Sequence, residues 1–524
     1  MERENIMCLL RLQGAEVSVT LEQDTLNWAY SKKRTWRRKS QSVSVPVDEM
    51  VTVQQGDSKQ QTKTIDAPSN LFTVYYVLRK SCKRWSLQMV TFTAPDAQVA
   101  HDWVQRIQEK IQKTGQSRPR KLLVFINPYG GRGKASRIYY TKISPLFQLA
   151  GIESDVIETT RANHARDYIM DSDLQKYDGV VCVGGDGMFS ELLHGLVKRT
   201  QSDSGISEDQ EDARLTPCSL RIGIIPAGST DCVCFATMGI NDPVTSALHI
   251  IIGDTQPMDV CASYHDGELM RYSVSLIGYG FFGDVLRESE NMRWVGPLRY
   301  DLAGIRMVLS NRSYRGTVEF LEANDNNSSP RDNTRCRTGC LVCSESSDRL
   351  SAISESKKLV ENLDDVSQLE DWKSVTGSFA ALNITGMSSA CPKSQDGLSP
   401  TAHLADGTAD LIMVQKCSIL QFIKHLSRHT NGKDQFALPN VKVHRIHALR
   451  FTPEQLDDDE VIRRQKRPFV CPCGEDSVNS TWNCDGEILD CAQLSIRVHH
   501  QLIQLFARGI EDMPCRYSSS LPPP

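Results

Sequence analysis

The chain has 524 residues, of which 40% are hydrophobic and 24% are charged. Its length suggests about three domains, and its composition is typical of globular proteins and excludes fibrous and intrinsically disordered classes. The net charge of −4 excludes a polyanion-binding role for the chain as a whole, although residues 1–120 contain 19 Lys and Arg against 12 Asp and Glu. This basic front predicts contact with an anionic surface.

The 17 cysteines are odd in number, and several of them, such as Cys182, lie inside apolar runs. This distribution predicts reduced thiols in the cytoplasm and not a disulfide framework. The N-terminus lacks the apolar stretch and cleavage site of a signal peptide, and no uncharged run is long enough to span a bilayer. We therefore expect a cytoplasmic protein whose membrane contacts are peripheral.

Residues 1–115 form the first predicted domain. Short strand-like runs separated by polar turns occur at residues 16–21, 42–47, 72–78 and 85–92. A helical pattern that carries Trp103 follows over residues 95–113. Several strands followed by one amphipathic helix with a Trp resemble a pleckstrin-homology domain, which implies a membrane-targeting function.

A basic run at Lys32–Lys39 lies between two of these strands. In pleckstrin-homology domains, basic loops at this position bind phosphoinositides. The resemblance therefore implies a phosphoinositide site made of Lys32, Lys33, Arg34, Arg37, Arg38 and Lys39. A solvated loop without a ligand remains the alternative, and nucleic acid is not an expected partner.

Residues 121–255 alternate between strand and helix patterns. The predicted strands are residues 121–127, 155–159, 179–183 and 221–225, and the predicted helices are residues 138–150, 165–172 and 189–198. This alternation predicts an α/β domain with a parallel, doubly wound sheet.

Residues 256–510 carry strand-like runs with few helices between them. The main runs are residues 269–277, 316–321, 377–384, 409–415 and 494–499. They predict a second domain that is a largely antiparallel β-sandwich. Two polar stretches, about 322–371 and 454–480, are predicted to be loop insertions, and residues 511–524 form a tail.

The segment Gly184–Gly187 follows an apolar strand and precedes a helix. Its sequence, Gly-Gly-Asp-Gly, lets the backbone approach a phosphate group and expose its N–H groups at the start of the helix. Asp186 would then lie at the reacting centre, where it could accept a hydroxyl proton or help to bind Mg²⁺. A tight turn with a capping Asp is the alternative for this motif taken alone.

Two further strands end in small-residue turns, at Asn127–Gly131 and at Pro226–Asp231. The carboxyl ends of parallel strands lie along one edge of a sheet, so three such turns together favour a broad phosphate site. The segment 130–135 resembles a Walker A loop but has the wrong spacing, and neither a protein-kinase catalytic loop nor a dinucleotide fingerprint is present. The sequence predicts a nucleotide site of another kind.

In order, Asn-Pro-x-Gly-Gly, Gly-Gly-Asp-Gly, Pro-Ala-Gly-Ser-Thr-Asp and Asp-Gly-Glu resemble the catalytic region of the diacylglycerol kinase and sphingosine kinase superfamily over about residues 120–510. The likeness is greatest to the ceramide kinases, because Met188 replaces a Thr that many diacylglycerol kinases have and because of the pleckstrin-homology-like front. The resemblance implies a two-domain lipid kinase that uses ATP and Mg²⁺ to phosphorylate the primary hydroxyl of ceramide. It also implies location at Golgi or plasma membranes.

Carried over residue by residue, the resemblance makes Asp186 the catalytic base within a substrate site formed by Gly184–Gly187. The implied ATP-binding residues are Asn127, Pro128, Tyr129, Thr159, Thr160, Arg161, Ala162, Asn163, Glu191, Gly228, Ser229, Thr230, Asp485, Gly486 and Glu487. The segment 279–300 resembles a sphingosine kinase segment, which implies that Arg293 and Arg299 neutralise phosphate and that Asp284 contacts the lipid head. Asp406 is an alternative candidate for the base or for a metal ligand.

Cys336, Cys340 and Cys343 have a spacing close to that of metal ligands. Structural zinc needs four ligands, and the fourth would come from elsewhere, either from Cys391 or from the pair Cys471 and Cys473. Reduced thiols without metal are the other interpretation.

Two further functions remain open beside ceramide phosphorylation. The acceptor could be sphingosine or diacylglycerol, since the motifs themselves indicate only phosphoryl transfer and the family resemblance alone implies ceramide. The chain could also be a non-catalytic, phosphoinositide-binding adaptor, although Asp186, Glu191 and Glu487 are all present.

Overall fold

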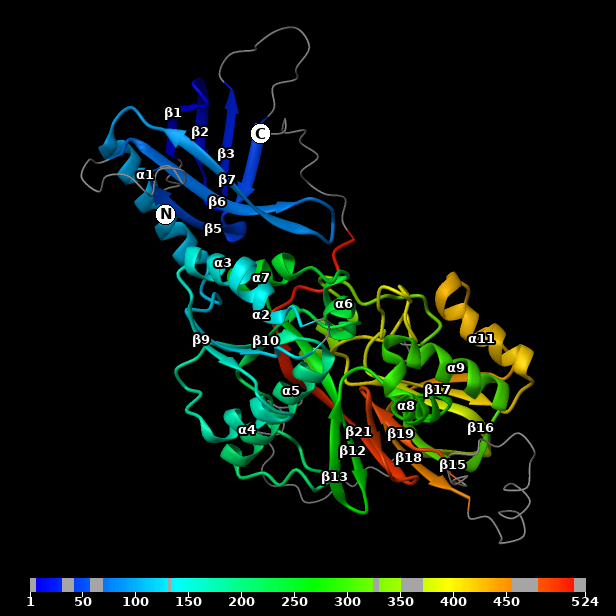
Figure 1. The fold of residues 1–524 in the computed structure, drawn as a ribbon. Helices are drawn as coiled ribbons and strands as arrows, with labels where there is room; N and C mark the ends of the chain where they lie inside the picture. Colours follow the sequence, from blue (N-terminus) through cyan, green and yellow to red (C-terminus); the bar gives the residue numbers. More distant parts are fainter. Residues whose placement is uncertain are drawn as a thin grey trace.

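The computed structural model describes residues 6–30, 42–56, 69–130, 133–323, 329–349, 371–454 and 479–512. It contains a small β domain, an α/β domain and a sheet-rich domain beside the latter (Figure 1). The predicted fold class is confirmed. The basic run Lys32–Lys39 and the pair Cys471 and Cys473 lie outside the described residues.

The first domain is an antiparallel sheet with the strand order β4-β3-β2-β1-β7-β6-β5, followed by one helix. Its elements are β1 (Ile6–Leu12), β2 (Ala15–Leu21), β3 (Thr25–Tyr30), β4 (Ser42–Pro46), η1 (Val47–Glu49), β5 (Met50–Gln55), β6 (Leu71–Arg79), β7 (Trp85–Thr93) and α1 (Ala97–Thr114). The helix begins two residues later than the pattern suggests, because the Asp96 carboxylate accepts a hydrogen bond from the Val99 amide and caps it. Trp103 of α1 stacks on Phe72 in the core, as the amphipathic pattern predicts.

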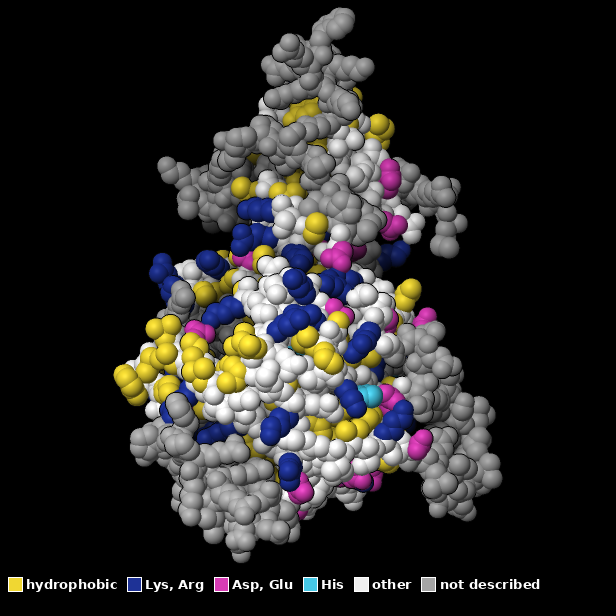
Figure 2. Space-filling view, turned by 90° about the vertical axis from the view of Figure 1, so that its right-hand side faces the viewer, with side chains coloured by type: hydrophobic (Ala, Val, Ile, Leu, Met, Phe, Trp, Pro, Cys, Tyr) yellow, Lys and Arg dark blue, Asp and Glu magenta, His cyan; other side chains and the backbone are white. Residues whose placement is uncertain are grey.

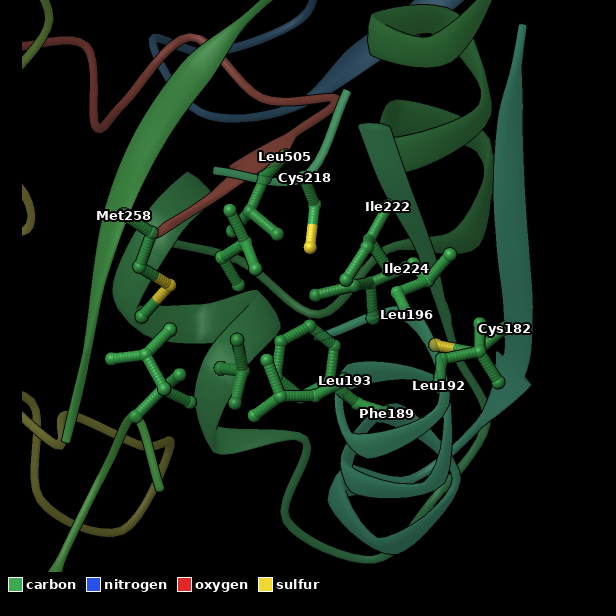
Figure 3. Packing of buried hydrophobic residues seen from close by; sticks show 14 of the residues in the cluster. Cys182, Phe189, Leu192, Leu193, Leu196, Cys218, Ile222, Ile224, Met258 and Leu505 are labelled. Carbon is green, nitrogen blue, oxygen red and sulfur yellow. The ribbon is translucent and has the colours of Figure 1, made fainter. Parts of the chain in front are cut away.

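The α/β domain is built on four parallel strands in the order β11-β10-β8-β9. Its elements are β8 (Lys121–Ile126), α2 (Ala135–Ile138), η2 (Tyr139–Ile143), α3 (Ser144–Leu149), β9 (Glu153–Glu158), α4 (His164–Asp171), β10 (Gly179–Gly184), α5 (Asp186–Ser204), β11 (Arg221–Pro226), α6 (Cys232–Met238) and α7 (Pro243–Ile252). Apolar side chains of α5 pack on β10 and β11, among them Phe189, Leu192 and Leu196 (Figure 3). On the other face of the sheet, α3 and α7 complete a second core.

The sheet-rich domain shares a continuous sheet with the α/β domain. Its elements are β12 (Gln256–His265), β13 (Glu268–Ser273), β14 (Ile277–Gly280), α8 (Phe281–Asn291), η3 (Arg293–Leu298), α9 (Arg299–Ser310), β15 (Tyr314–Glu322), β16 (Trp372–Thr385), β17 (Ala409–Gln415), α11 (Ile419–Asn431), β18 (Val441–Pro453), β19 (Trp482–Cys484), β20 (Glu487–Leu489) and β21 (Leu494–Leu505). The last strand, β21, pairs antiparallel with β12 and β18 and parallel with β11. β21 therefore joins the strands of the two domains into one sheet.

Two sequence-based expectations in this domain are wrong in detail. The run 269–277 is not one strand, because the amides of residues 274–276 bind the carboxylate of Asp485 instead of a neighbouring strand. Few helices were expected between the strands, whereas α8, η3, α9 and α11 lie between them and cover one side of the domain (Figure 1). Residues 341–349, inside the predicted insertion, are also helical.

The first domain packs directly on the α/β domain. Trp85 donates its backbone N–H to the Thr245 hydroxyl and stacks on His249, with 3.8 Å between the ring centroids. Arg79 forms ion pairs with Glu49 and with Glu511, which follows β21. These contacts fix the orientation of the first domain relative to the α/β domain.

Candidate active site

The three small-residue turns lie at one edge of the parallel sheet, as predicted. β8, β10 and β11 run parallel in register and end at Ile126, Gly184 and Pro226. The Asn127 amide donates to the Val183 carbonyl, and the Ala227 amide donates to the Gly184 carbonyl. The turns that follow the three strands are therefore held side by side.

Glycine is required where two of these turns touch. A Cβ on Gly228 would lie 2.6 Å from the Cα of Gly185, which is backbone that cannot move aside. Asn127 shapes the third turn, because its Oδ1 accepts hydrogen bonds from the amides of Tyr129 and Gly130 at 3.0 and 2.9 Å. Tyr129, Gly187, Ser229 and Thr230 are exposed, so this edge is open to a ligand.

Asp186 is the half-exposed first residue of α5. Its two carboxylate oxygens accept hydrogen bonds from the amides of Cys232 and Val233, at 3.0 and 3.1 Å, at the start of α6. The side chain is thus oriented by the turn after β11 and does not simply cap its own helix. This contact could not be predicted from the sequence, because the partners lie 46 and 47 positions away in the chain.

Asp231 ends the small-residue turn Pro226–Asp231 and was not predicted to be a site residue. The structure places it beside Asp186. Its Oδ1 accepts a hydrogen bond from the Gly228 amide at 2.9 Å. Burial, opposed by that hydrogen bond and reinforced by the charge of Asp186, raises the pKa of Asp231 to about 6. Two carboxylates in contacting turns, one of them with a displaced pKa, are typical of a reaction centre or of a cation site. The position of this acidic residue at the end of a small-residue turn could have identified it from the sequence.

Glu191 and the segment Thr159–Asn163 lie together. The Glu191 Oε2 accepts a hydrogen bond from the Ala165 amide at 3.3 Å, at the start of α4, directly after that segment. Within the segment, Thr159 is buried, and Thr160, Arg161, Ala162 and Asn163 are exposed. The structure therefore brings Glu191 and this predicted ATP-binding segment to the same edge.

Asp485, Gly486 and Glu487 span the hairpin turn between β19 and β20, with positive φ at Asp485 and Gly486. The Asp485 carboxylate accepts hydrogen bonds from the amides of Val274, Ser275 and Leu276 at 2.7 to 3.1 Å. These contacts give Asp485 a structural role, because its carboxylate braces the backbone of residues 274–276. This role is additional to its predicted role in ATP binding. Burial raises its pKa.

The turn at Asp485 is linked to the α/β domain. Ser275, held by Asp485, has its hydroxyl 3.6 Å from the Cys232 sulfur, and the Cys232 amide binds Asp186. The returning Asp-Gly-Glu turn is therefore connected to Asp186 through two residues. Arg271, which sequence reasoning missed, adds a second link, because its guanidinium contacts the Ser190 hydroxyl at 3.0 Å and Glu487 at 3.6 Å.

Arg293 and Arg299 do not contact the strand-end turns in the described part of the chain. Both form ion pairs with Glu290 of α8, and Arg299 also stacks on Tyr300. They lie in η3 and at the start of α9.

Asp284 is buried in the first turn of α8. Its carboxylate accepts hydrogen bonds from the Tyr314 and Ser480 hydroxyls at 2.6 and 2.7 Å, and burial raises its pKa. It borders a cavity of about 10 Å³ between α8, α9 and α11, whose other lining residues are Phe281, Met307, Asn311, Arg312, Ala380 and Phe422. That volume holds at most one water molecule. A lipid could enter there only after the helices move apart.

Asp406, the alternative base, lies in the loop before β17. Its Oδ1 accepts hydrogen bonds from the amide and the hydroxyl of Thr408, at 3.0 and 2.8 Å. Among the described residues it makes no side-chain contact with the strand-end turns.

An apolar ridge lies on the surface of the sheet-rich domain. We define it as Trp294 and Leu298 of η3, Leu302, Ile305 and Leu309 of α9, and Leu420 and Ile423 of α11, whose exposed fractions range from 45% to 88%. Residues 298, 302, 305 and 309 share one helical face. Figure 2 views the molecule from the side of α9 and α11 and shows hydrophobic side chains gathered there, with Lys and Arg around them.

Comparisons with known proteins cover all three domains. Family models match at residues 6–107 (ceramide kinase PH domain), 121–263 (diacylglycerol kinase catalytic domain) and 275–518 (ceramide kinase C-terminal domain). The chain is 47% identical to a human (Homo sapiens) ceramide kinase over 90% of both chains. It is 33% identical to a ceramide kinase of Arabidopsis thaliana over 82% of this chain and 79% of that protein.

Among solved structures, a putative diacylglycerol kinase from Bacillus anthracis str. Sterne aligns with a TM-score of 0.48 and 15% identity, over 74% of this chain and 97% of its own. Within the described residues, no helix combines the length and the apolar character needed to cross a membrane.

Proposed function

Because the chain belongs to the ceramide kinase family, we propose that it transfers the γ-phosphoryl group of ATP to the primary hydroxyl of ceramide, giving ceramide 1-phosphate and ADP. The observation that carries this proposal is the edge formed by the three contacting turns, with the oriented carboxylate of Asp186 at its centre. Phosphoryl transfer depends mainly on positioning and on charge stabilisation, and such an edge supplies both.

In this mechanism Asp186 accepts the proton of the ceramide hydroxyl as its oxygen attacks the γ-phosphorus. The backbone amides of Cys232 and Val233 hold the carboxylate in one orientation, so the proton acceptor is pre-positioned. The exposed residues Gly187, Ser229 and Thr230 would lie beside the phosphates, and the N-terminal end of α5 would add a partial positive charge. Asn127 and the segment Thr159–Asn163 line the rest of the nucleotide site.

The carboxylates also fit a magnesium ion that arrives with ATP. Mg²⁺ prefers oxygen ligands and binds through one or two carboxylates together with substrate phosphates. Asp186 and Asp231, in contacting turns, are the nearest such pair, and a cation would favour the ionised form of Asp231. The ion would neutralise charge on the transferring phosphoryl group.

A panel of acceptors tests the proposal. Purified full-length protein is incubated with radiolabelled ATP, Mg²⁺ and mixed micelles that contain ceramide, sphingosine or diacylglycerol. We expect transfer to ceramide in clear excess over the other two. Preferred transfer to sphingosine or diacylglycerol would show that this lipid, and not ceramide, is the acceptor. No transfer to any lipid would support the non-catalytic adaptor.

We further propose that the apolar ridge rests on an anionic membrane, where ceramide resides, together with a phosphoinositide site in the first domain. The segment 416–433 that contains α11 carries Lys416, Lys424, Arg428 and Lys433 and no acidic residue. Each Lys or Arg near an anionic leaflet contributes about 1 kcal/mol, and the exposed apolar side chains can insert at the interface. The packing of Trp85 against His249 joins the first domain to the α/β domain, whose sheet continues into the domain that carries the ridge.

Replacing Leu302 and Ile305 together by Gln is expected to weaken binding to phosphatidylserine vesicles at least tenfold, because each buried aliphatic side chain contributes about 1.5–3 kcal/mol. Vesicle flotation measures this, and activity on a short-chain, water-dispersible ceramide should stay near wild type. Met270→Gln on β13, an exposed apolar residue outside the ridge, is the matched control. Unchanged vesicle binding by the double variant would rule the ridge out as a membrane contact.

A further inference from the structure

The insertion between β15 and β16 carries three members of a cluster of four potential metal ligands. The sulfurs of Cys336, Cys340 and Cys343 and one ring nitrogen of His403 all lie within 4.8 Å of one another. His403 belongs to the loop before β17, sixty positions beyond the last cysteine. Cys391, a predicted candidate for the fourth ligand, is not part of this cluster, and its backbone forms an isolated β-bridge with that of Ser394.

The distances within the cluster match a tetrahedral zinc site. With Zn–S bonds of about 2.3 Å, two thiolates of a tetrahedron lie about 3.8 Å apart. The Cys336 and Cys343 sulfurs are 3.8 Å apart, and the Cys340 sulfur is 3.3 Å from Nδ1 of His403. A disulfide would need about 2.05 Å and would leave Cys340 and His403 unused.

Burial makes the cluster hard to explain without a ligand. Cys343 is 6% exposed and His403 is 1% exposed. Among the described residues, the only hydrogen-bond contact of the His403 ring is the Cys340 sulfur, and its Nε2 is buried with no partner. An imidazole taken out of water for one weak thiol contact is costly, whereas a metal bond would offset that cost.

We propose that Cys336, Cys340, Cys343 and His403 bind one structural Zn²⁺ ion. Four protein ligands leave no open position, so the ion has no catalytic role. Binding displaces the three thiol protons and forms three Zn–S bonds and one Zn–N bond, without any redox change. The spacing of Cys340 and Cys343 is that of paired zinc ligands.

The ion would join the insertion to the core beneath the catalytic edge. The loop of His403 is anchored to β12, since the Asp259 amide donates to the Leu404 carbonyl and the Asp259 carboxylate accepts from the Gly407 amide. Leu404 packs in the same core as Phe189 and Leu193 of α5. The zinc site therefore fixes a segment that supports the helix beginning at Asp186.

The experiment measures metal in the full-length protein purified under reducing conditions. Inductively coupled plasma mass spectrometry is expected to find one zinc ion per chain after gel filtration, and alkylation of the thiols should release it to a colorimetric chelator. After exchange with Co²⁺, the protein should show the visible absorption of tetrahedral cobalt with thiolate charge transfer. Loss of the zinc on gel filtration, absence of these bands, or a Cys336–Cys343 disulfide in the native protein would overturn the proposal.

Variants assign the ligands. Cys340→Ser and His403→Ala should lose the zinc, and His403→Cys should retain it, because four cysteines also bind zinc. Cys417→Ser is the matched control, since Cys417 is half-buried and lies outside the cluster. Stoichiometric zinc in His403→Ala would exclude His403 as a ligand. These readouts need no kinase activity, so their failure is separate from failure of the proposed reaction.

Discussion

Asp186→Asn is expected to lower kcat for ceramide by about a thousandfold, within the range of about 10²–10⁴ that a lost general base costs. The amide cannot take up the hydroxyl proton. The KM for ATP should rise by a much smaller factor, because Asn removes one negative charge from the proposed magnesium site but no direct phosphate contact. An Asn side chain has one acceptor oxygen for the two amides of Cys232 and Val233, so stability should fall by about 1–3 kcal/mol without loss of the fold. Steady-state kinetics and thermal unfolding measure the two effects.

Asp406→Asn is the reciprocal test, because Asp406 is the other candidate for the base. Within the described ranges, its carboxylate accepts hydrogen bonds from Thr408 alone, and an Asn oxygen can accept the same bonds, so kcat should remain near wild type. Near-normal turnover by Asp186→Asn together with a large loss in Asp406→Asn would move the base to Asp406.

Asp485→Ala is expected to be among the most destabilising single changes in the described chain. Three backbone amides at residues 274–276 would lose their acceptor, and an unpaired buried donor costs about 1–3 kcal/mol. We expect a loss of about 3–5 kcal/mol and a Tm lower by about 6–15 °C. Differential scanning calorimetry measures this loss.

Glu487→Gln in the same hairpin turn is the matched control. The Glu487 side chain is 59% exposed and contacts Arg271 only at 3.6 Å, so stability should change by less than about 0.5 kcal/mol. If Asp485 acted mainly on the nucleotide, Asp485→Ala would raise the KM for ATP at unchanged Tm, which is the opposite of the expected pattern.

Local sequence signals were sufficient to predict that the small-residue turns meet at one edge of the parallel sheet. The turns after Ile126, Gly184 and Pro226 could be placed together because parallel strands align their carboxyl ends. Each turn also carried its own signature in small residues.

Contacts between residues that are distant along the chain could not be predicted from the sequence. The brace between Asp485 and residues 274–276, and the addition of His403 to three cysteines, join segments separated by tens to hundreds of positions. A single His or Asp in a loop has no characteristic spacing to other residues that would identify it as a metal ligand or as a structural contact. The helix α9 was missed for another reason, because its apolar face points outward at the ridge and not into a core.

The pairing of β21 with β11 has a consequence for synthesis of the protein. Ile222 pairs with Leu505, which leaves the ribosome about 280 residues later, or roughly 15–55 s later at about 5–20 residues per second. Until then, β11 is an open sheet edge, and the α/β domain cannot close. The nascent chain is therefore a natural client for chaperones that shield exposed strands, and a nonsense mutation before residue 494 would leave the nucleotide-binding domain unfinished as well.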